Sequence, residues 1–446
     1  MQESVTTGIG GLALDINEIS SRAFNIFSTF DADTSFKRGY YVDYRPISTV
    51  DSNGPFEFSI PRDEVNWTDM QKTRLEGRVK IVKADGTNAA SSDTFSVCNM
   101  FYQSLFENIL FEIEGVKLDD PSAKTYPYKS YIETLLSYSK SVKESTVDSL
   151  NIWKTDTPGK FDDLETGNSG FTERKTLFSE SKNRYFSIPL YLDICHSHKY
   201  LPPRLSMKFS FRRNSDDFSL LYTGNALTYK IVIDNIKLRI YKITPSQKIY
   251  DFYTSRIASD NAKLNIDRSI IKSYVIPKGT TDLSRYKAFE GQKLPEQLII
   301  GIIPQSAFNG NNAKNPFNFQ HYNLREANLL VNGVPEPLYK YQLNIKDKDT
   351  ASFYSEFLEN VGVSTDNKEI GIDHDSYYNG NFLIAFDRSP DKSNRFRQFL
   401  TEGGLMDINL ILSKPTTEVL IVLVYATYSD ILTIDAQSKL ATSYSI

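Results

Sequence analysis

The sequence predicts an all-β protein made of two domains, and three observations support this fold class. Apolar and polar residues alternate through most of the chain, which is typical of half-buried strands. The chain contains 28 Phe and 27 Tyr but only 2 Trp, and Tyr and Phe favour the pleated surface of a sheet. Its 446 residues exceed one ordinary core and suit two domains of about 200 residues each.

Composition narrows the class of protein further. Apolar residues make up 40% of the chain and the net charge is −4, so packed cores are expected and no nucleic-acid-binding surface is indicated. Cys98 and Cys195 are too few for a disulfide-rich secreted domain, so we expect buried thiols in a reducing compartment. We expect no signal peptide, because Met1–Gly11 is polar and rich in Gly and Thr, without a cationic start or an apolar core. We expect no membrane span, because the longest apolar run, Val419–Ala426, is short and suits a buried strand.

The first part of the chain divides into an arm and a β domain. Residues 1–34 are rich in Gly, Ser, Thr and Asp and are predicted to be an N-terminal arm. Residues 35–244 are predicted to form the first domain. The apolar parity shifts near Asp234-Asn235, which predicts a β-bulge or a change of face. The strands expected in this domain are Phe56–Ile60, Leu75–Ile81, Ile109–Ile113, Phe186–Leu192, Leu205–Phe211 and Tyr229–Ile243.

One segment interrupts the strands with a helical period. Thr125–Tyr138 reads TYPYKSYIETLLSY, and Pro127 suits the first turn of a helix. The polar stretch Ser139–Lys182 that follows is predicted to be a long loop. The helix would present one apolar face made of Tyr128, Tyr131, Ile132, Leu135 and Leu136, which are spaced as one side of a helix.

The second part of the chain begins after Pro245. A second helical stripe predicts a helical linker over residues 245–262, and residues 263–446 are predicted to form the second domain. The stripe consists of Ile249, Phe252, Tyr253 and Ile257. The strands expected in the second domain are Ile270–Ile276, Leu298–Ile303, Ala327–Val331, Phe382–Phe386, Ile408–Leu412 and Val419–Tyr428.

A short internal similarity links the two domains. Ile109–Val116 reads ILFEIEGV and Ala327–Val334 reads ANLLVNGV, each a strand that ends in a polar-Gly-Val turn. This favours two copies of one β architecture. Many short strands with few helices indicate sandwiches or barrels rather than a parallel α/β sheet.

Residues that could carry chemistry are few. Cys195-His196-Ser197-His198 is the strongest metal candidate, but adjacent donors without a distant partner do not close a tetrahedral site. Asp373-His374-Asp375 could be an acid–base cluster or a cation loop, and a solvated loop explains it better. We therefore predict that the protein is not an enzyme and binds no cofactor or metal.

Three further motifs have plain explanations. Gly8–Gly11 lacks the preceding strand that a phosphate-binding loop needs. Asn66-Trp67-Thr68 spells a glycosylation sequon without an expected secretory signal. Arg395-Phe396-Arg397 could touch nucleic acid or an acidic neighbour, and a solvated loop is the simpler interpretation.

Several segments together resemble the major capsid proteins of Polinton/Maverick elements, adintoviruses and virophage-like double-stranded DNA viruses. The resemblance runs from about Tyr41 to about Tyr428. Residues 1–35 match nothing in the family, and Lys160–Lys182 is only loosely similar. The segments that carry it are YVDYRPISTV at Tyr41–Val50, PFEFSI at Pro55–Ile60, TYPYKSYIETLLSY at Thr125–Tyr138, WKTDTPG at Trp153–Gly159, YVIPKG at Tyr274–Gly279 and SAFNGNNAKNPFNFQHYNL at Ser306–Leu324.

The resemblance implies a double jelly roll, which is two eight-stranded β-sandwiches side by side with short helical insertions. It implies a homotrimeric, pseudo-hexagonal capsomer that tiles an icosahedral shell around double-stranded DNA, without sequence-specific DNA binding. The implied partners are neighbouring capsomers, a vertex (penton) protein and minor capsid proteins, and the implied location is the virion, assembled in the cytoplasm or nucleus of a host cell. A carbohydrate-binding or hydrolytic two-domain sandwich is the alternative.

For a capsid protein, the expected chemistry is association through aromatic anchors. The same side chains could instead pack inside their own domain, and the sequence leaves both possibilities open. The candidate interface residues are Tyr126, Tyr128 and Tyr131 in the predicted helix, and Phe308, Phe317 and Phe319 in the turn-rich segment Phe308–His321.

Overall fold

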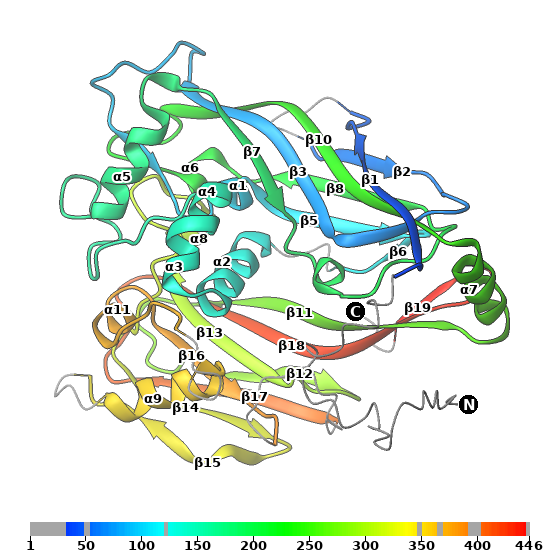
Figure 1. The fold of residues 1–446 in the computed structure, drawn as a ribbon. Coiled ribbons are helices and arrows are strands. Elements are labelled where there is room, and N and C mark those ends of the chain that lie inside the picture. Colours follow the sequence, from blue (N-terminus) through cyan, green and yellow to red (C-terminus); the bar gives the residue numbers. More distant parts are fainter. Residues whose placement is uncertain are drawn as a thin grey trace, which may run out of the picture.

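The computed structural model describes residues 33–48, 54–119, 124–345, 350–363, 369–390 and 403–442. The predicted arm, apart from Asp33 and Thr34, lies outside the described residues, as do Gly8–Gly11 and Arg395-Phe396-Arg397. The described chain forms two β-sandwiches, which lie one above the other in Figure 1. No helix in the described part of the chain has the length and apolar run that crossing a bilayer requires.

The first sandwich consists of two four-stranded sheets. One sheet has the order β1-β10-β3-β7 and the other β2-β8-β5-β6, while β4 and β9 form a separate ribbon. The strands are β1 (Phe36–Tyr44), β2 (Phe56–Ile60), β3 (Trp67–Lys83), β4 (Phe95–Val97), β5 (Phe106–Ile113), β6 (Val116–Lys117), β7 (Arg184–Pro189), β8 (Met207–Arg213), β9 (Leu220–Tyr222) and β10 (Tyr229–Pro245).

The second sandwich repeats this arrangement. Its sheets have the orders β11-β18-β13-β16 and β12-β17-β14-β15, and β19 adds to the edge of β18. The strands are β11 (Ala262–Ile276), β12 (Arg285–Gly291), β13 (Gln297–Pro304), β14 (Leu324–Val331), β15 (Val334–Gln342), β16 (Leu383–Asp387), β17 (Gly404–Leu412), β18 (Leu420–Ile434) and β19 (Leu440–Thr442).

The two sandwiches share one topology. If the eight sheet strands of each sandwich are numbered in chain order, leaving out β4, β9 and β19, both have sheets ordered 1-8-3-6 and 2-7-4-5. Every printed strand pair is antiparallel. Two four-stranded sheets connected in this way form a jelly roll. The prediction of two eight-stranded jelly rolls is therefore confirmed.

Alternating side chains build the cores of the sandwiches. Along β8, the residues at Met207, Phe209 and Phe211 are buried and those between them are more exposed. Phe56 of β2 pairs with Phe211 in the register of the sheet, and their rings stack with centroids 5.3 Å apart. In β10, the register shifts between Asp234 and Lys237, which confirms the predicted bulge.

The internal sequence similarity falls on equivalent hairpins. The strands β5 and β6 are joined through Glu114 (φ 50°) and Gly115 (φ 78°), and β14 and β15 through Asn332 (φ 51°) and Gly333 (φ 83°). Two central residues with positive φ define the tight turn that matches strand twist. These strands are fourth and fifth in each sandwich, so the similarity marks the same place in both copies.

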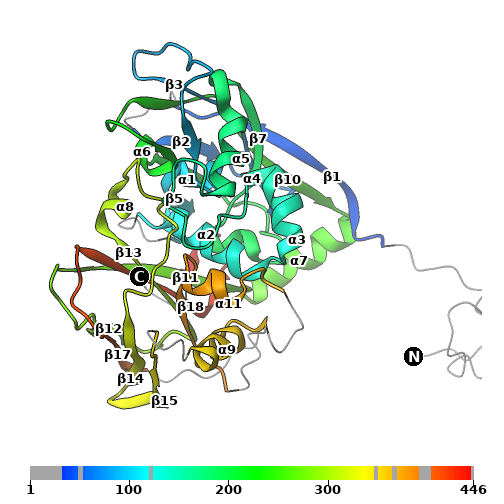
Figure 2. The ribbon, with the colours of Figure 1, turned by 90° about the vertical axis from the view of Figure 1, so that its left-hand side faces the viewer.

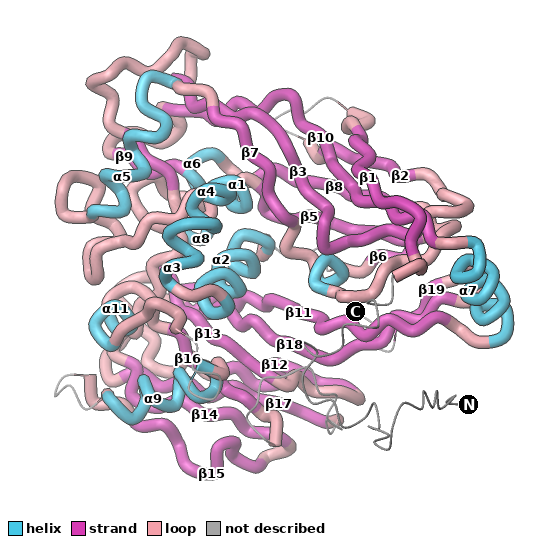
Figure 3. Tube along the Cα trace, in the orientation of Figure 1, coloured by secondary structure: helices cyan, strands magenta, loops and turns pink. Residues whose placement is uncertain are grey.

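Most helices lie toward the end of the sandwiches that faces the viewer in Figure 2, and α7 lies at the opposite end (Figure 1). Figure 3 shows strands filling the two sandwiches and the helices placed around them. The helices are α1 (Phe101–Ser104), α2 (Tyr126–Ser137), α3 (Lys140–Val142), α4 (Asp148–Asn151), α5 (Ser169–Phe178), α6 (Asp216–Ser219), α7 (Gln247–Ser259), α8 (Gln305–Asn309), α9 (Ala351–Asn360) and α11 (His374–Tyr378).

The prediction of a loop over Ser139–Lys182 is wrong, because this stretch contains α3, α4 and α5 with a π-helical turn at Lys143–Val147. Asn168 caps α5 by accepting hydrogen bonds from the backbone N–H groups of Gly170 and Phe171. Arg174 of α5 is fully buried and pairs with Asp156 at 2.7 Å. A helix cap and a buried ion pair stabilise this segment, and no apolar period in the sequence marks it as helical.

One helix lies between the two sandwiches in the chain. The predicted second helix is confirmed as α7, which lies between β10 and β11. The division of the chain into domains at residues 244 and 262 stays a prediction; in the structure, β10 ends at Pro245 and β11 begins at Ala262.

The strand β7 is shorter than predicted. It ends at Pro189, and the chain then enters a 3-10 turn at Asp193–His196 instead of extending the strand to Leu192.

Candidate functional site

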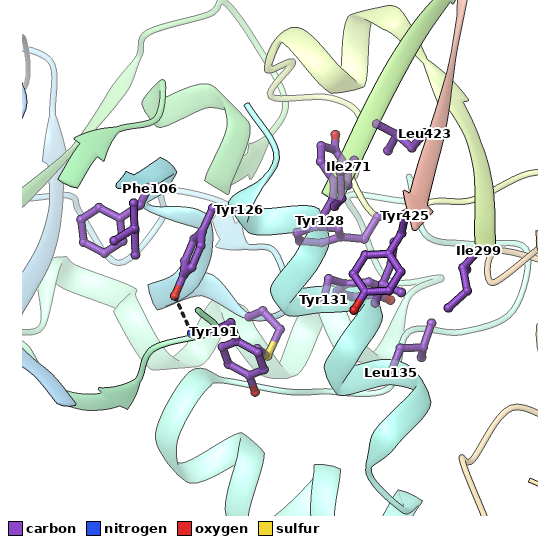
Figure 4. Close-up of a cluster of buried hydrophobic side chains, with 14 of the residues drawn as sticks. Phe106, Tyr126, Tyr128, Tyr131, Leu135, Tyr191, Ile271, Ile299, Leu423 and Tyr425 are labelled. Carbon is purple, nitrogen blue, oxygen red and sulfur yellow. Dashed lines mark hydrogen bonds between the residues drawn. The ribbon is translucent and has the colours of Figure 1, made fainter. Parts of the chain in front are cut away.

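The helix α2 lies between the two sandwiches. It begins after Thr125, with Pro127 in its first turn, where the missing N–H is not needed for helix hydrogen bonds. Figure 4 shows Tyr128, Tyr131 and Leu135 on the side of α2 that approaches strands of the second sandwich. The labelled residues from the second sandwich are Ile271 of β11, Ile299 of β13, and Leu423 and Tyr425 of β18.

Aromatic rings from the second sandwich complete this contact. The ring of Phe317 stacks on Tyr131 with centroids 4.2 Å apart and planes 3° apart. The ring of Phe308 stacks on Tyr128 at 5.7 Å. Such pairs add about 0.5–1.5 kcal/mol beyond the burial of their area. The segment between β13 and β14 therefore packs against α2, the helix of the first sandwich.

A glycine allows the segment to fold back onto its own strand. A Cβ atom on Gly301 of β13 would lie 2.6 Å from the ring of Phe319, closer than van der Waals contact permits. Phe319 is fully buried, and its ring also lies 6.1 Å from Tyr131. Gly301 thus makes room for the ring that supports the interdomain stack.

The tyrosines of α2 differ in what their hydroxyl groups contact. The Tyr126 hydroxyl donates to Oε1 of Gln103 at 2.6 Å and accepts from the backbone N–H of Tyr191 at 3.2 Å. The buried Tyr128 hydroxyl has no hydrogen-bond partner within the described residues. Burial raises the pKa of both phenols well above the usual value, so both stay protonated near neutral pH.

A buried ion pair lies beside the aromatic contact. Lys129 of α2 pairs with Asp193 of the 3-10 turn, and both residues are buried. Asp193 also accepts hydrogen bonds from the backbone N–H and the hydroxyl of Ser269, at 3.0 and 2.7 Å. Burial opposes ionisation of Asp193, but the charge and hydrogen bond of Lys129, together with Ser269, lower the pKa of this carboxyl. Since Ser269 belongs to β11, the pair ties both sandwiches to α2.

Glu133, one helical turn after Lys129, makes a second polar contact across the boundary. Its Oε1 accepts a hydrogen bond from the Tyr425 hydroxyl of β18 at 3.1 Å. Its Oε2 lies 3.8 Å from Nε2 of His196. Burial raises the pKa of Glu133, and the neighbouring Lys129 and His196 reduce that rise. Glu133 thus adds polar contacts to the seam, the name we use for the contact between α2 and the second sandwich.

Lys143 provides a third connection between the halves of the chain. Its Nζ donates to the carbonyl oxygens of Leu135, at 2.8 Å, and Ile370, at 2.5 Å. It also lies 5.4 Å from the centre of the Trp153 ring. Burial lowers the pKa of this amine to about 8. A buried ammonium group therefore bridges the α2 region and the segment that precedes β16.

The structure brings all six predicted aromatic residues into this one region. Five of them are buried within the single chain and Phe308 is partly buried against the core. A contact between any of them and a neighbouring chain stays a prediction. The polar residues of the seam were not predicted: Lys129 and Glu133 are spaced like an exposed helical pair, and nothing in the sequence links either to Asp193.

The other sequence candidates have structural roles. Cys195 is buried and its thiol pKa is raised by burial. Asp373 caps α11 by accepting from the backbone N–H of Ser376 at 2.8 Å. In the sequon, Trp67 and Thr68 lie in β3. Within the described ranges, no group of three or more His, Cys, Asp or Glu is arranged to hold a metal ion.

Comparison with solved structures finds similar folds over almost the whole chain. The Sputnik virophage structure matches with a TM-score of 0.62 and 12% identity, covering 99% of this chain and 94% of that one. The Faustovirus major capsid protein gives 0.56 and 12%, covering 91% and 92%. The mavirus major capsid protein gives 0.52 and 9%, covering 99% and 97%.

The chain has the double jelly-roll fold of these capsid proteins. An uncharacterized protein of Caenorhabditis elegans is 21% identical over 402 residues, which cover 86% of this chain and 92% of the relative. No family model matches the sequence. The likeness to these solved structures is one of fold, with two jelly rolls in one chain.

Proposed function

We propose that the protein is a major capsid protein that forms homotrimeric, pseudo-hexagonal capsomers. Its capsomers tile an icosahedral shell around double-stranded DNA, and it resides in the virion. The observation that carries this proposal is the pair of jelly rolls with identical strand order in one chain. Three such chains present six similar rolls around a threefold axis, which is the geometry that a hexagonal lattice needs.

The seam at α2 supports this role because a lattice subunit must keep a fixed shape. Stacked rings, the hydrogen bonds from Ser269 to the buried ion pair, and a buried lysine join the two rolls. Packed interfaces of this kind hold one relative orientation, since cores resist deformation. In this proposal the six aromatic residues act by fixing the rolls of one chain relative to each other. Contacts with a penton protein and minor capsid proteins belong to other surfaces.

Mass and shape in solution test the proposal. The purified full chain is expected to sediment as a trimer with about three times the monomer mass of 50.8 kDa. Negative-stain images are expected to show pseudo-hexagonal particles, and shells at high protein concentration. A folded monomer at micromolar concentration that forms no larger assembly would overturn the proposal. Glycan-array binding by such a monomer would favour the carbohydrate-binding alternative.

A further inference from the structure

A groove of about 560 Å³ opens at the end of the molecule where α7 joins the two rolls. Its walls come from the start of β1, the start of β3, the end of β10, the helix α7, the start of β11 and the segment that includes Tyr200. Aromatic side chains line it: Trp67 and Tyr253 lie with ring centroids 5.2 Å apart, and Phe36 and Tyr200 are 6.2 Å apart. The groove is therefore largely apolar.

The helix α7 leaves its apolar face uncovered. Its 13 residues carry the stripe Ile249, Phe252, Tyr253 and Ile257, yet none of its residues is buried. Phe252 is 59% exposed and Tyr253 is 42% exposed. Amphipathic helices of globular proteins normally pack such a face onto a core. Trp67 beside it has a buried indole N–H that meets no acceptor within the described chain.

The groove is also positively charged at its rim. Lys199, Arg256 and Lys263 line it, and Asp260 is the one acidic residue among the lining residues. Asp260 lies 3.9 Å from Arg256 and 3.8 Å from Lys263, so these two cations share one carboxylate. An apolar segment with a net negative charge would suit this surface.

The chain itself contains such a segment directly before the groove. Residues 1–32 carry Glu3, Asp15, Glu18 and Asp31 against one Arg22, a net side-chain charge of −3. Within residues 12–30, Asp15 and Glu18 against Arg22 leave a net charge of −1. Their apolar residues recur three or four positions apart, the spacing of one helix face. These residues are Leu12, Ile16, Ile19, Ala23, Ile26 and Phe30.

We propose that residues 12–30 cover the α7 groove of their own chain, with the apolar residues on Phe252, Tyr253 and Trp67 and the carboxylates toward the basic rim. Ser35 and Phe36 already line the groove, and the five residues from Phe30 to Ser35 span at most about 18 Å. A tethered segment experiences a local concentration in the millimolar range with a short linker. The segment of the same chain therefore outcompetes that of another copy.

Photo-cross-linking of the full chain tests which segment occupies the groove. A benzophenone amino acid replaces Phe252, whose ring lies 5.3 Å from that of the groove residue Tyr253. The same group replaces Tyr185 of β7 as the matched control, because Tyr185 is 74% exposed and lies outside the groove. Mass spectrometry is expected to locate the Phe252 cross-link in residues 12–30 and the Tyr185 cross-link elsewhere. A Phe252 cross-link confined to other segments, or none, would overturn the proposal.

Mixing chains labelled with heavy and light isotopes separates the occupants. Cross-links within one label are expected; cross-links that join heavy to light chains would show a second copy's segment in the groove and overturn the same-chain proposal. This result is independent of capsid assembly, because a trimer can form with either arrangement. An empty groove would likewise overturn the groove proposal and leave the proposed capsid function untouched.

A truncated chain supplies a second measurement. Removal of residues 1–32 is expected to increase the fluorescence of a dye that binds apolar surfaces, and a synthetic peptide of residues 10–32 is expected to reverse the increase. A peptide with Ile19→Asp and Ile26→Asp is expected to bind at least about tenfold more weakly, equivalent to about 1.4 kcal/mol. Equal binding by both peptides, or no binding by the first, would contradict the proposal.

Discussion

Two neighbouring tyrosines of α2 show how one atom decides the effect of a substitution. Tyr126 and Tyr128 are both buried, but the Tyr126 hydroxyl has two hydrogen-bond partners and the Tyr128 hydroxyl has none among the described residues. A buried polar group without a partner costs about 1–3 kcal/mol. The two hydroxyls therefore contribute to stability with opposite sign.

The first prediction removes each hydroxyl in turn. Tyr128→Phe is expected to raise the free energy of unfolding by about 1 kcal/mol, because it deletes an unsatisfied polar atom. Tyr126→Phe is expected to lower it by about 1–2 kcal/mol, because Gln103 and the Tyr191 N–H each lose a partner. Urea denaturation of both variants measures the difference. The opposite order of stabilities would refute this account of the seam.

The second prediction concerns acid stability and Asp193. Its folded-state pKa lies below the usual value of 3.8, so its stabilising contribution is present above pH 3.8 and is lost as pH falls through the folded pKa. Asp193→Asn is expected to destabilise the protein at pH 7 by about 3–5 kcal/mol, since Lys129 loses its buried partner. The difference from the wild type is expected to shrink toward pH 2.

Melting temperatures between pH 7 and pH 2 provide the measurement for Asp193. Glu165→Gln is the matched control, because Glu165 is exposed and an exposed carboxylate contributes little. A constant difference between Asp193→Asn and wild type across this range would show that the ionisation of Asp193 does not contribute to stability.

At the level of secondary-structure elements, the two equivalent hairpins depend on their glycines. Gly115 and Gly333 both have positive φ, and nothing lies within 4 Å of a Cβ placed on either. Any cost of a side chain there must come from the backbone, which for L-residues is about 1–2 kcal/mol in the left-handed region. The two turns thus offer a test free of steric clashes.

The third prediction compares three glycine substitutions. Gly115→Ala and Gly333→Ala are each expected to lower the free energy of unfolding by about 1 kcal/mol or more. Gly54→Ala is the control, since Gly54 also has nothing within 4 Å and does not have a positive φ. It is expected to change stability by less than about 0.5 kcal/mol. Equal effects at all three positions would argue against the turn geometry as the cause.

Many of the strands that the sequence predicted are buried on one face, as β8 is, or on both faces, as β13 and β16 are. Strands such as β5 and β8 alternate cleanly between buried and more exposed residues. Their apolar residues therefore recur at every second position, and this pattern can be recognised in the sequence. The strand β1 was missed because it is an edge strand that is largely exposed. Its pairing with β10 depends on backbone hydrogen bonds, which leave no pattern of apolar residues.

The candidate site was predictable in its aromatic part and not in its polar part. The period of α2 identified Tyr128 and Tyr131 as one face, and the partner rings stood out as an unusual cluster of Phe residues in a turn-rich segment. The pairing of Lys129 with Asp193 joins residues 64 positions apart. Such a contact arises only when the 3-10 turn and α2 are brought together by the fold.

At the scale of the whole molecule, the seam makes the two rolls one packed body. Buried residues of both rolls and of α2 belong to a single hydrophobic cluster within the described chain. A shared core favours cooperative unfolding of both rolls together. Removal of one central ring of the seam should weaken that cooperativity more than it weakens either roll.

The fourth prediction uses calorimetry to test this coupling. The wild type is expected to unfold in a single transition, and Phe317→Ala is expected to lower stability by about 3–5 kcal/mol and to separate the transition into two. Phe209→Ala, inside the core of the first roll, is the matched control and is expected to lower the transition temperature without separating it. Two transitions in the wild type would contradict a shared core.

In each roll, the start of the first strand lies beside the end of the last strand. Phe36 at the start of β1 pairs with Pro245 at the end of β10, and Ala262 at the start of β11 pairs with Ile434 near the end of β18. Two copies of one ancestral gene, fused head to tail, would therefore need only a short connecting peptide and no rearrangement of strands. The residues between β10 and β11, which include α7, are short enough to be such a peptide, and the identical strand order of the two rolls is the geometry that a tandem duplication would leave.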